Sequence, residues 1–213
     1  MLYLCSVIRN KSTNIVMEKK YKLTEESITF NGRKLYRIEA IRDFGLIKKG
    51  DKGGFIEKEI NLSHDGTAWV RDDAKVFGGA KVYGDAWVFG NAYVFCGSKV
   101  CGNANVYGTA SVSGYARVFD GAKVYGDACV FGNANVHGYA CVSDNASVYG
   151  NANVFGNACV YGNALVNDNA CVSENASVYD NAFVSGNARV SGNTNVSGDA
   201  NVCGEEDYIL FKN

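Results

Sequence analysis

Residues 86–103 read AWVFGN, AYVFCG and SKVCGN, which are three successive copies of one six-residue unit. The unit repeats 23 times from Ala68 to Glu205 with no insertion or deletion. Its third residue is Val in all 23 copies, and its first is Ala in 21, the exceptions being Ser98 and Thr194. The fifth residue is mostly Gly, and the sixth is mostly Asn or Asp. So strict a period decides the fold, because it must come from a structural unit that repeats with it.

The spacing within the unit predicts a short strand followed by a bend. Ala and Val lie two residues apart, so both point into one interior, whereas the second and fourth residues point outward. Gly, Asn and Asp tolerate the left-handed backbone that a corner needs. Three sides close a triangle, and neighbouring turns stack about 4.8 Å apart. The sequence therefore predicts an all-β parallel β-helix, one strand wide on each side, with about seven to eight triangular turns.

Composition excludes several other classes of protein. With 47% hydrophobic residues, the chain is too apolar for a disordered glycine-rich polymer, despite its 25 Gly. A net charge of −1 does not predict a nucleic-acid partner. The N-terminus lacks the features of a signal peptide, and no apolar run is long enough to predict a membrane span. Eight Cys without an export signal predict free thiols in a cytoplasmic protein.

The chain divides into three predicted domains. Residues 62–205 hold the β-helix and the approach to it. Residues 1–61, which break the repeat, predict a small β-rich capping and association domain, called the head below. Residues 206–213 include several apolar side chains and predict a cap. Both ends need covering, because an open solenoid end exposes strand edges and apolar core.

Within the head, the pair Asn31-Gly32 separates two runs rich in strand formers, residues 21–30 and 34–41. This pattern predicts a β-hairpin. Further along, residues 51–55 (DKGGF) predict a loop that leads into the first turn of the repeat. The Gly pair in it could instead cradle a phosphate, but the Lys-Ser/Thr ending of a P-loop is missing.

The pattern A-x-V-x-G-N resembles the hexapeptide-repeat family of left-handed parallel β-helices, over about two thirds of the chain. The resemblance implies left-handed winding, which the spacing alone does not give. The arrangement of a short head, a linker and a long prism is similar to hexapeptide-repeat proteins encoded by phages and prophages, which are often labelled transferases. That similarity implies a phage origin and the host cytoplasm, and it supplies no activity.

Every eighteenth residue shares a side of the prism, so the outward residues sort into three faces. Face one is the side of Trp69, face two that of Lys75 and face three that of Lys81. The predicted interface residues on face one are Trp69, Trp87, Phe89, Tyr107 and Tyr125. An apolar patch of this size usually marks an interface, so we expect it to contact a second copy or the head. We therefore predict a homo-oligomer, a dimer or a trimer, although stacked rings also support one another without a partner.

Face three combines cations with rings. The predicted ligand-binding residues form two adjacent rows: Lys81, Lys99 and Arg117, then Tyr83, Phe119 and His137. Cations beside rings can hold an anionic ligand that stacks, such as a nucleotide. The alternative is a solvated row of charges that discourages aggregation.

The hexapeptide-repeat acyltransferases generally use a His base, often on a loop that leaves the prism, and bind acyl-CoA or acyl carrier protein between trimer subunits. No such loop is predicted here, because no unit is interrupted. The two His of the chain are His64, at the entry to the first turn, and His137, with no carboxylate in its own unit. A flat face gives little help in orienting substrates or excluding water. We predict no complete catalytic site and a structural or incidental role for each His. His137 is the candidate base only if the chain is an enzyme.

No cofactor and no metal site are predicted. The family's carbonic anhydrases hold zinc with three His, and this chain has two. Cys101 and His137 share face three but lie two rungs apart, about 10 Å, which is too far for one metal without a partner chain. The eight Cys lack paired CxxC spacing.

These observations favour a non-catalytic β-solenoid that binds or assembles, with a host protein or an anionic small molecule as its partner. The first alternative is an acyltransferase-like enzyme with a site between trimer subunits, which rests on analogy of fold. The second is a structural component that assembles with itself.

Overall fold

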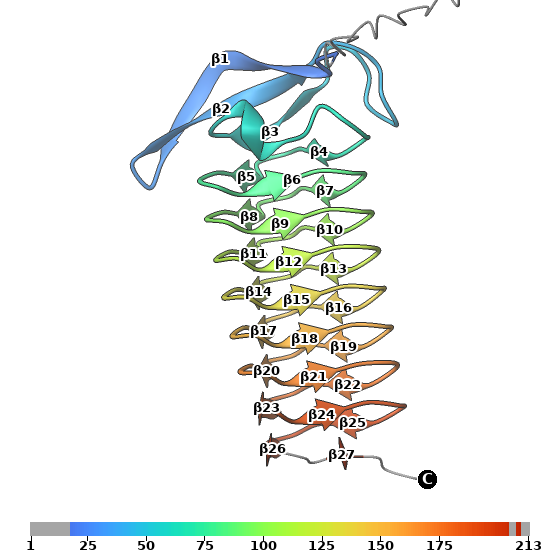
Figure 1. The fold of residues 1–213 in the computed structure, drawn as a ribbon. Coiled ribbons are helices and arrows are strands. Elements are labelled where there is room, and N and C mark those ends of the chain that lie inside the picture. The colour runs from blue at the N-terminus through green and yellow to red at the C-terminus, as the bar shows by residue number, and fades with distance from the viewer. Residues whose placement is uncertain (1–17, 205–207, 210–213) are drawn as a thin grey trace, which may run out of the picture.

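The computed structural model describes residues 18–204 and the backbone of residues 208–209. In Figure 1, stacked turns form a long column with a small β-rich head at one end. Two of its three sheets contain eight strands each, one strand per turn, so the column has about eight turns. The described residues form strands and one short 3-10 helix, with no α-helix. The predicted all-β parallel solenoid is therefore confirmed, and its left-handed sense stays a prediction.

Three stacks of short parallel strands form the three faces. Face one contains β4 (Trp69–Val70), β7 (Trp87–Val88), β10 (Asn105–Val106), β13 (Lys123–Val124), β16 (Cys141–Val142), β19 (Cys159–Val160), β22 (Ser177–Val178) and β25 (Asn195–Val196). Face two contains β5 (Lys75–Val76), β8 (Tyr93–Val94), β11 (Ser111–Val112), β14 (Cys129–Val130), β17 (Ser147–Val148), β20 (Leu165–Val166), β23 (Phe183–Gly186) and β26 (Asn201–Gly204). Face three contains β6 (Lys81–Val82), β9 (Lys99–Val100), β12 (Arg117–Val118), β15 (Asn135–Val136), β18 (Asn153–Val154), β21 (Cys171–Val172), β24 (Arg189–Val190) and β27 (Tyr208–Ile209).

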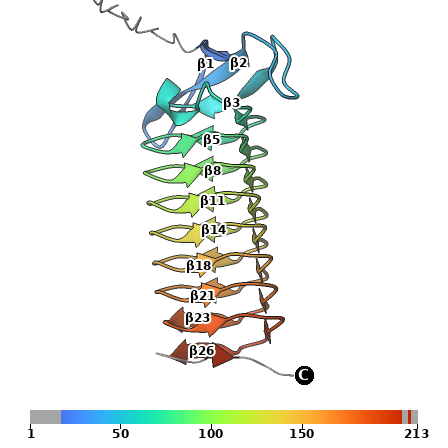
Figure 2. The same cartoon turned by 45° about the vertical axis from the view of Figure 1, so that its right-hand side comes forward.

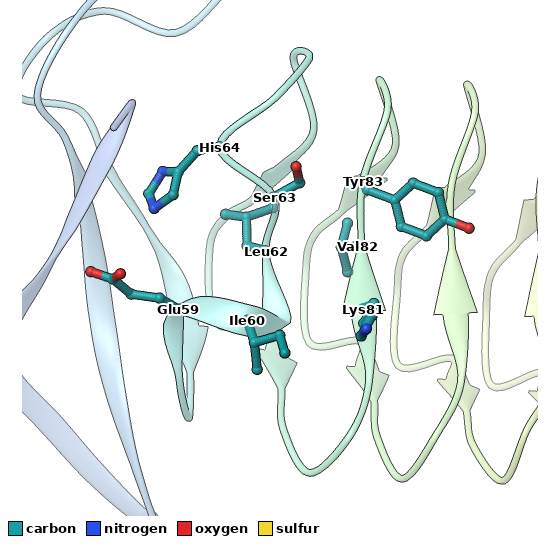
Figure 3. Close-up of a pocket in the computed structure, with 8 residues that line it drawn as sticks. All are labelled: Glu59, Ile60, Leu62, Ser63, His64, Lys81, Val82 and Tyr83. Atoms are coloured by element: carbon teal, nitrogen blue, oxygen red, sulfur yellow. The ribbon is translucent and has the colours of Figure 1, made fainter. Parts of the chain in front are cut away.

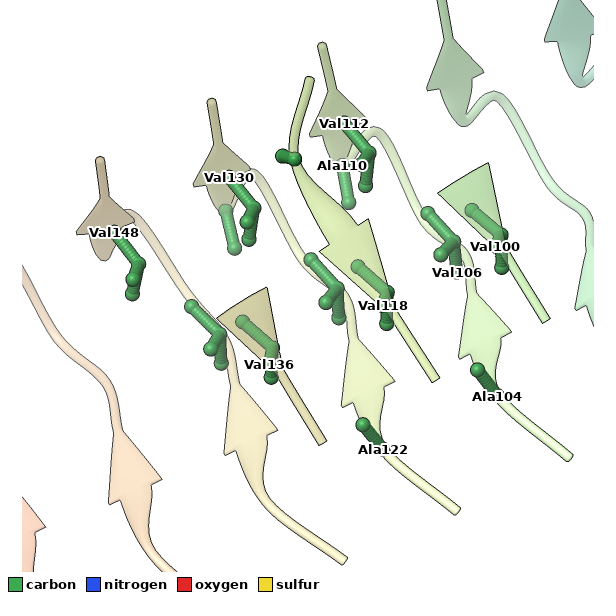
Figure 4. Close-up of a cluster of buried hydrophobic side chains, with 14 of the residues drawn as sticks. Val100, Ala104, Val106, Ala110, Val112, Val118, Ala122, Val130, Val136 and Val148 are labelled. Carbon is green, nitrogen blue, oxygen red and sulfur yellow. The ribbon is translucent and has the colours of Figure 1, made fainter. Parts of the chain in front are cut away.

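The core is a column of Ala and Val side chains, as the repeat predicts. Figure 4 shows how the Val residues of the three faces, such as Val100, Val106 and Val112, meet inside the prism. All three are fully buried. The unit that begins with Ser98 keeps its hydroxyl satisfied inside the column, because Ser98 Oγ donates to Phe95 O at 2.8 Å. The break in the Ala pattern therefore leaves no unpaired hydroxyl there.

From Asp72 to Gly198 the corners are built by the fifth residue of the unit, which has a positive φ whether it is Gly, an acid or, at one corner, Cys96. Where an acid stands there, its carboxylate accepts a hydrogen bond from the amide of the residue 18 positions later, which is Gly in every case. These pairs are Asp72–Gly90, Asp120–Gly138, Asp144–Gly162, Asp168–Gly186, Glu174–Gly192 and Asp180–Gly198. The arrangement satisfies an amide at the corner and keeps like charges from stacking directly on one another.

The sixth residue builds amide ladders along the ridges of the tail half. In each ladder an Asn side chain donates to the Asn or Asp one turn later, at 3.0–3.1 Å. The three ladders are Asn133–Asn151–Asn169–Asn187, Asn145–Asn163–Asn181–Asp199 and Asn157–Asn175–Asn193. Such stacked amides are a recurring feature of parallel, in-register strands.

The head joins the column through one continuous sheet. Strands β1 (Tyr21–Phe30) and β2 (Arg33–Ala40) form an antiparallel hairpin, with positive φ at the predicted turn residues Asn31 and Gly32. Strand β3 (Lys52–Ile56) then pairs antiparallel with β2 and parallel with β5, which extends face two into the head. Figure 2 shows this transition at the top of the column. The hairpin prediction is confirmed.

The predicted loop over residues 51–55 is wrong, because Lys52 to Phe55, with both glycines, lie in β3. A Cβ on Gly53 would come within 2.5 Å of Val70 O, and one on Gly54 within 2.7 Å of Ala74 O. These glycines therefore allow two backbones to approach closely instead of making a turn.

The head also packs on the first turn through buried side chains. Trp69 meets the rings of Phe44 at 5.3 Å and Tyr21 at 6.2 Å. Lys20 is fully buried beside them, and burial, followed by the nearby Arg42, lowers its pKa to about 8.

At the other end of the column, the backbone of β27 pairs with β24. The rest of the predicted cap, residues 206–207 and 210–213, lies outside the described residues, and the three domain limits stay a prediction.

The corner hydrogen bonds predict the effect of substitutions at Asp144. Asp144→Ala removes the acceptor of the Gly162 amide. It also places Ala at φ 56°, a left-handed conformation that Ala has no polar side chain to stabilise. We expect a loss of about 1–3 kcal/mol in the free energy of unfolding, measured by urea denaturation. Asp144→Asn, which keeps an acceptor and tolerates this backbone, should lose much less. Equal losses for the two variants would contradict this role.

Candidate ligand-binding face

The predicted cation row on face three is present as a ladder. Lys81 in β6 pairs in register with Lys99 in β9, which pairs with Arg117 in β12. All three residues are exposed, and no ion pair among the described residues involves them. Like charges on directly neighbouring strands repel one another. A bound anion would relieve this repulsion, which makes the ladder a candidate anion site.

The predicted ring row is present only in part. Phe119, His137 and Phe155 form a continuous stack, with centroids 4.6 and 5.1 Å apart and planes within 7° of parallel. Both faces of the His137 ring are therefore covered by its neighbours, and the guanidinium of Arg117 lies 5.0 Å from the Phe119 ring. Face-to-face stacking of a ligand inside this row would require the rings to separate. What these rings offer as they stand is mainly their edges.

A carboxylate stands beside His137 that the sequence analysis missed. Asp120 Oδ2 lies 3.8 Å from His137 Nδ1 and also accepts a hydrogen bond from the amide of Gly138. Asp120 sits at a corner of the preceding turn, 17 residues earlier, so a search within the unit of His137 does not find it. Reading the corner residues with the 18-residue period would have placed the two side chains near each other.

An apolar cleft of about 530 Å³ opens where the head meets face three. Figure 3 shows its lining, which comes from the 3-10 turn η1 (Glu59–Asn61), the segment after it and strand β6. The lining residues are Glu59, Ile60, Leu62, Ser63, His64, Lys81, Val82 and Tyr83. Two of the predicted ligand residues, Lys81 and Tyr83, therefore lie at this cleft, so the cation ladder has an apolar recess at its head end.

Two side chains of the cleft carry perturbed groups. The side-chain hydrogen bond with Cys101, together with burial, raises the pKa of Tyr83. Burial lowers the pKa of His64, whose ring stacks on Tyr21 at 4.3 Å and whose Nδ1 accepts a hydrogen bond from Lys20 N. His64 thus contributes to the packing of the head on the column, in agreement with its predicted place at the entry to the first turn.

The predicted interface residues on face one divide between two environments. Trp69 is 1% exposed, because the head covers it. Trp87 is half-buried, with the guanidinium of Arg71 6.0 Å from its ring. Phe89, Tyr107 and Tyr125 form a half-buried stack with centroids 4.8 and 5.0 Å apart. These four residues, unlike Trp69, keep surface that a partner could cover.

The described cysteines are all free. Cys141 and Cys159 stack in register on face one, and burial, followed by Cys141, raises the pKa of the Cys159 thiol. Within residues 18–204 no group of three or more His, Cys, Asp or Glu side chains has the geometry to hold a metal ion. The same residues contain no helix long and apolar enough to cross a membrane.

Comparison with known proteins agrees with the fold. A family model described as the YdcK beta solenoid repeat matches residues 182–198. The chain is also 39% identical over 70 residues to a protein of Escherichia coli (strain K12) that is named uncharacterized acetyltransferase YdcK. That match covers 29% of this chain and 22% of the relative, so the chain spans less than a quarter of the relative's length. The chain is therefore a β-solenoid repeat protein, similar over part of its length to a protein that carries the name acetyltransferase.

Proposed function

We propose that the protein is a non-catalytic binding protein whose face three holds an anion with a planar ring, such as a nucleotide. The observation that carries the proposal is the ladder of Lys81, Lys99 and Arg117, which has no described ionic partner and ends at an apolar cleft. Phosphate oxygens would accept charge-assisted hydrogen bonds from Lys99 and Arg117. The planar ring of the ligand would enter the cleft and contact Tyr83 and Ile60, of which Ile60 is 64% exposed.

The solenoid suits this task because it is rigid. Neighbouring strands fix the backbone spacing of the three cationic residues, so a ligand does not have to order a loop when it binds. The resemblance of the repeat to phage and prophage proteins adds a biological setting to the proposal. In that setting the chain winds left-handed, acts in the host cytoplasm and captures a small anionic signal or a host factor.

The test compares two ligands that differ by one nucleoside, inorganic tripolyphosphate and ATP, by calorimetry without divalent metal. We expect both to bind, and ATP more tightly. Lys99→Glu should weaken both ligands at least tenfold, since it reverses a charge next to two other cations. Tyr83→Ala should weaken ATP alone, since tripolyphosphate has no ring to stack.

Lys123→Glu is the matched control for the charge reversal. Lys123 is equally exposed and lies in an equivalent strand, β13, but on face one. It should leave the affinity for both ligands nearly unchanged. Wild-type affinity in Lys99→Glu, or no binding of either ligand to the wild-type chain, would overturn the proposal.

We further propose that face one joins two or three copies of the chain. Trp87 and the stack of Phe89, Tyr107 and Tyr125 form a row of half-buried rings along three successive turns, and an apolar surface of this kind gains free energy when a partner covers it. A second copy is the partner that the predicted homo-oligomer implies. The head already covers Trp69, so the interface would begin at Trp87.

Sedimentation velocity tests this association. The wild-type chain should sediment as a dimer or trimer, and Tyr125→Lys should shift it to the monomer. The control is Tyr149→Lys, which alters the end of an equivalent ring stack on face two, where Phe131 lies 4.8 Å away. A wild-type monomer at all concentrations would contradict the proposal, and filaments that grow with concentration would favour a structural component instead.

An acetyltransferase is the second candidate function. It is favoured by the Asp120 carboxylate 3.8 Å from His137 Nδ1 and by the name of the E. coli protein that part of the chain resembles. With Nδ1 facing Asp120, the other ring nitrogen could take a proton from an amine that attacks the thioester of acetyl-CoA, and CoA would leave as the thiol. The covered faces of the His137 ring and the absence of a described loop around it count against this candidate.

Release of CoA thiol from acetyl-CoA in the presence of small amines distinguishes the two functions. If the chain is an acetyltransferase, His137→Ala should abolish release, and Asp120→Asn should lower the rate and alter its pH profile. Asp144→Asn serves as the control, because Asp144 makes the same corner hydrogen bond without a His beside it. A rate in His137→Ala equal to that of the wild type would exclude His137 as the base.

A further inference from the structure

On the ridge between face two and face three, an exposed tyrosine stands in place of the usual Asn or Asp. The sixth residue of the unit is Tyr at two positions, Tyr115 and Tyr139. Tyr115 is 74% exposed, and a Cβ built on Gly97, one turn nearer the head, would meet its ring at 2.8 Å. The ring therefore lies along the ridge over bare glycine backbone, in the place where the tail half carries its Asn ladders.

A hollow of about 580 Å³ accompanies this ring. Its lining consists of Gly79, Cys96, Gly97, Gly114 and Tyr115, so three of the five residues lack a side chain. Glycine at these positions lets a flat group approach the backbone closely. Tyr115 is therefore open to a ligand, unlike His137 on face three, whose ring is covered on both sides by stacked neighbours.

The hollow borders the cation ladder along its whole length. Gly79, Gly97 and Tyr115 each precede a ladder cation, Lys81, Lys99 and Arg117 respectively, by two residues. The cleft at Tyr83 lies at the head end of the same ladder. Two places for a ring thus flank one row of three cations, which spans two rung intervals, about 10 Å. One is at the level of Lys81, at the edge of face three that borders face one. The other is at the level of Lys99, on the ridge towards face two, where the Tyr115 ring lies over Gly97.

We infer that face three takes a ligand with two planar rings joined by a phosphate bridge, a dinucleotide, whose second ring stacks on Tyr115 in the ridge hollow. This inference rests on the proposed function, which places the phosphates on the ladder and the first ring in the cleft. The bridge would cross face three beside Lys81 and Lys99, between the two ring sites. A ligand with one ring would leave Tyr115 without a contact.

The experiment adds a third ligand to the series, diadenosine triphosphate, in which two adenosines share the three phosphates. The wild-type chain should bind it more tightly than ATP, although it carries less charge than ATP. The expected gain is roughly fivefold to a hundredfold, the contribution of one base stacked on an aromatic side chain. Tyr115→Ala should remove this gain and leave the affinities for ATP and tripolyphosphate unchanged, whereas Tyr115→Phe should keep it.

Tyr139→Ala is the matched control. Tyr139 is 75% exposed, and its ring likewise lies over a glycine, Gly121, but on the ridge between face three and face one, away from the ladder. It should not change the affinity for diadenosine triphosphate. If ATP binds and diadenosine triphosphate binds no more tightly, or if Tyr139→Ala has the same effect as Tyr115→Ala, this inference is wrong and the proposed function stands. Failure of all three ligands would instead remove the proposed function.

Discussion

The hydrogen bonds between successive turns impose the constraint on which the rest of this structure depends. The amide of Trp69 donates to Ala86 O at 3.0 Å, and that of Tyr83 donates to Val100 O at 3.1 Å, and the same step continues along the column. Each residue therefore stands directly beside the residue 18 positions later. One inserted residue would turn the Val side chains outward. Side chains on the surface must consequently line up in ladders, with one member from each turn at strand spacing.

In a ladder, the interaction between two neighbouring side chains is repeated at each turn. Asn amides donate to one another, and rings such as Phe131 and Tyr149 stack, so both kinds of ladder stabilise the column. Charges behave in the opposite way, and the corners avoid the problem by placing Gly below every acid that stands there. The cations of Lys81, Lys99 and Arg117 are stacked without such relief. The proposed anion site rests on this contrast between the separated corner acids and the stacked cations.

The period explains why so much of the fold could be predicted from the sequence. Alternation within the unit identifies the interior, and the 18-residue step by itself places Lys81 beside Lys99 and Cys141 beside Cys159. The errors and omissions concern contacts that the period does not describe. Gly53 and Gly54 permit close backbone approach at the junction with the head, and Asp120 reaches His137 from a corner to a face. The cleft between η1 and β6 needs the position of the head, which no repeat encodes.

The same constraint makes this surface better suited to binding than to catalysis. A base must reach its substrate in a site that orients the reacting atoms and excludes water. His137 stands within a stack, between Phe119 and Phe155, and the uninterrupted units supply no loop to close over it. A ligand that is only bound needs less, namely fixed cations and a recess for its ring. Those features occur where the repeat is altered locally: at the junction with the head, and on the ridge where Gly97 and Tyr115 replace the usual Asn. On a column this regular, departures from the repeat are where specificity can reside.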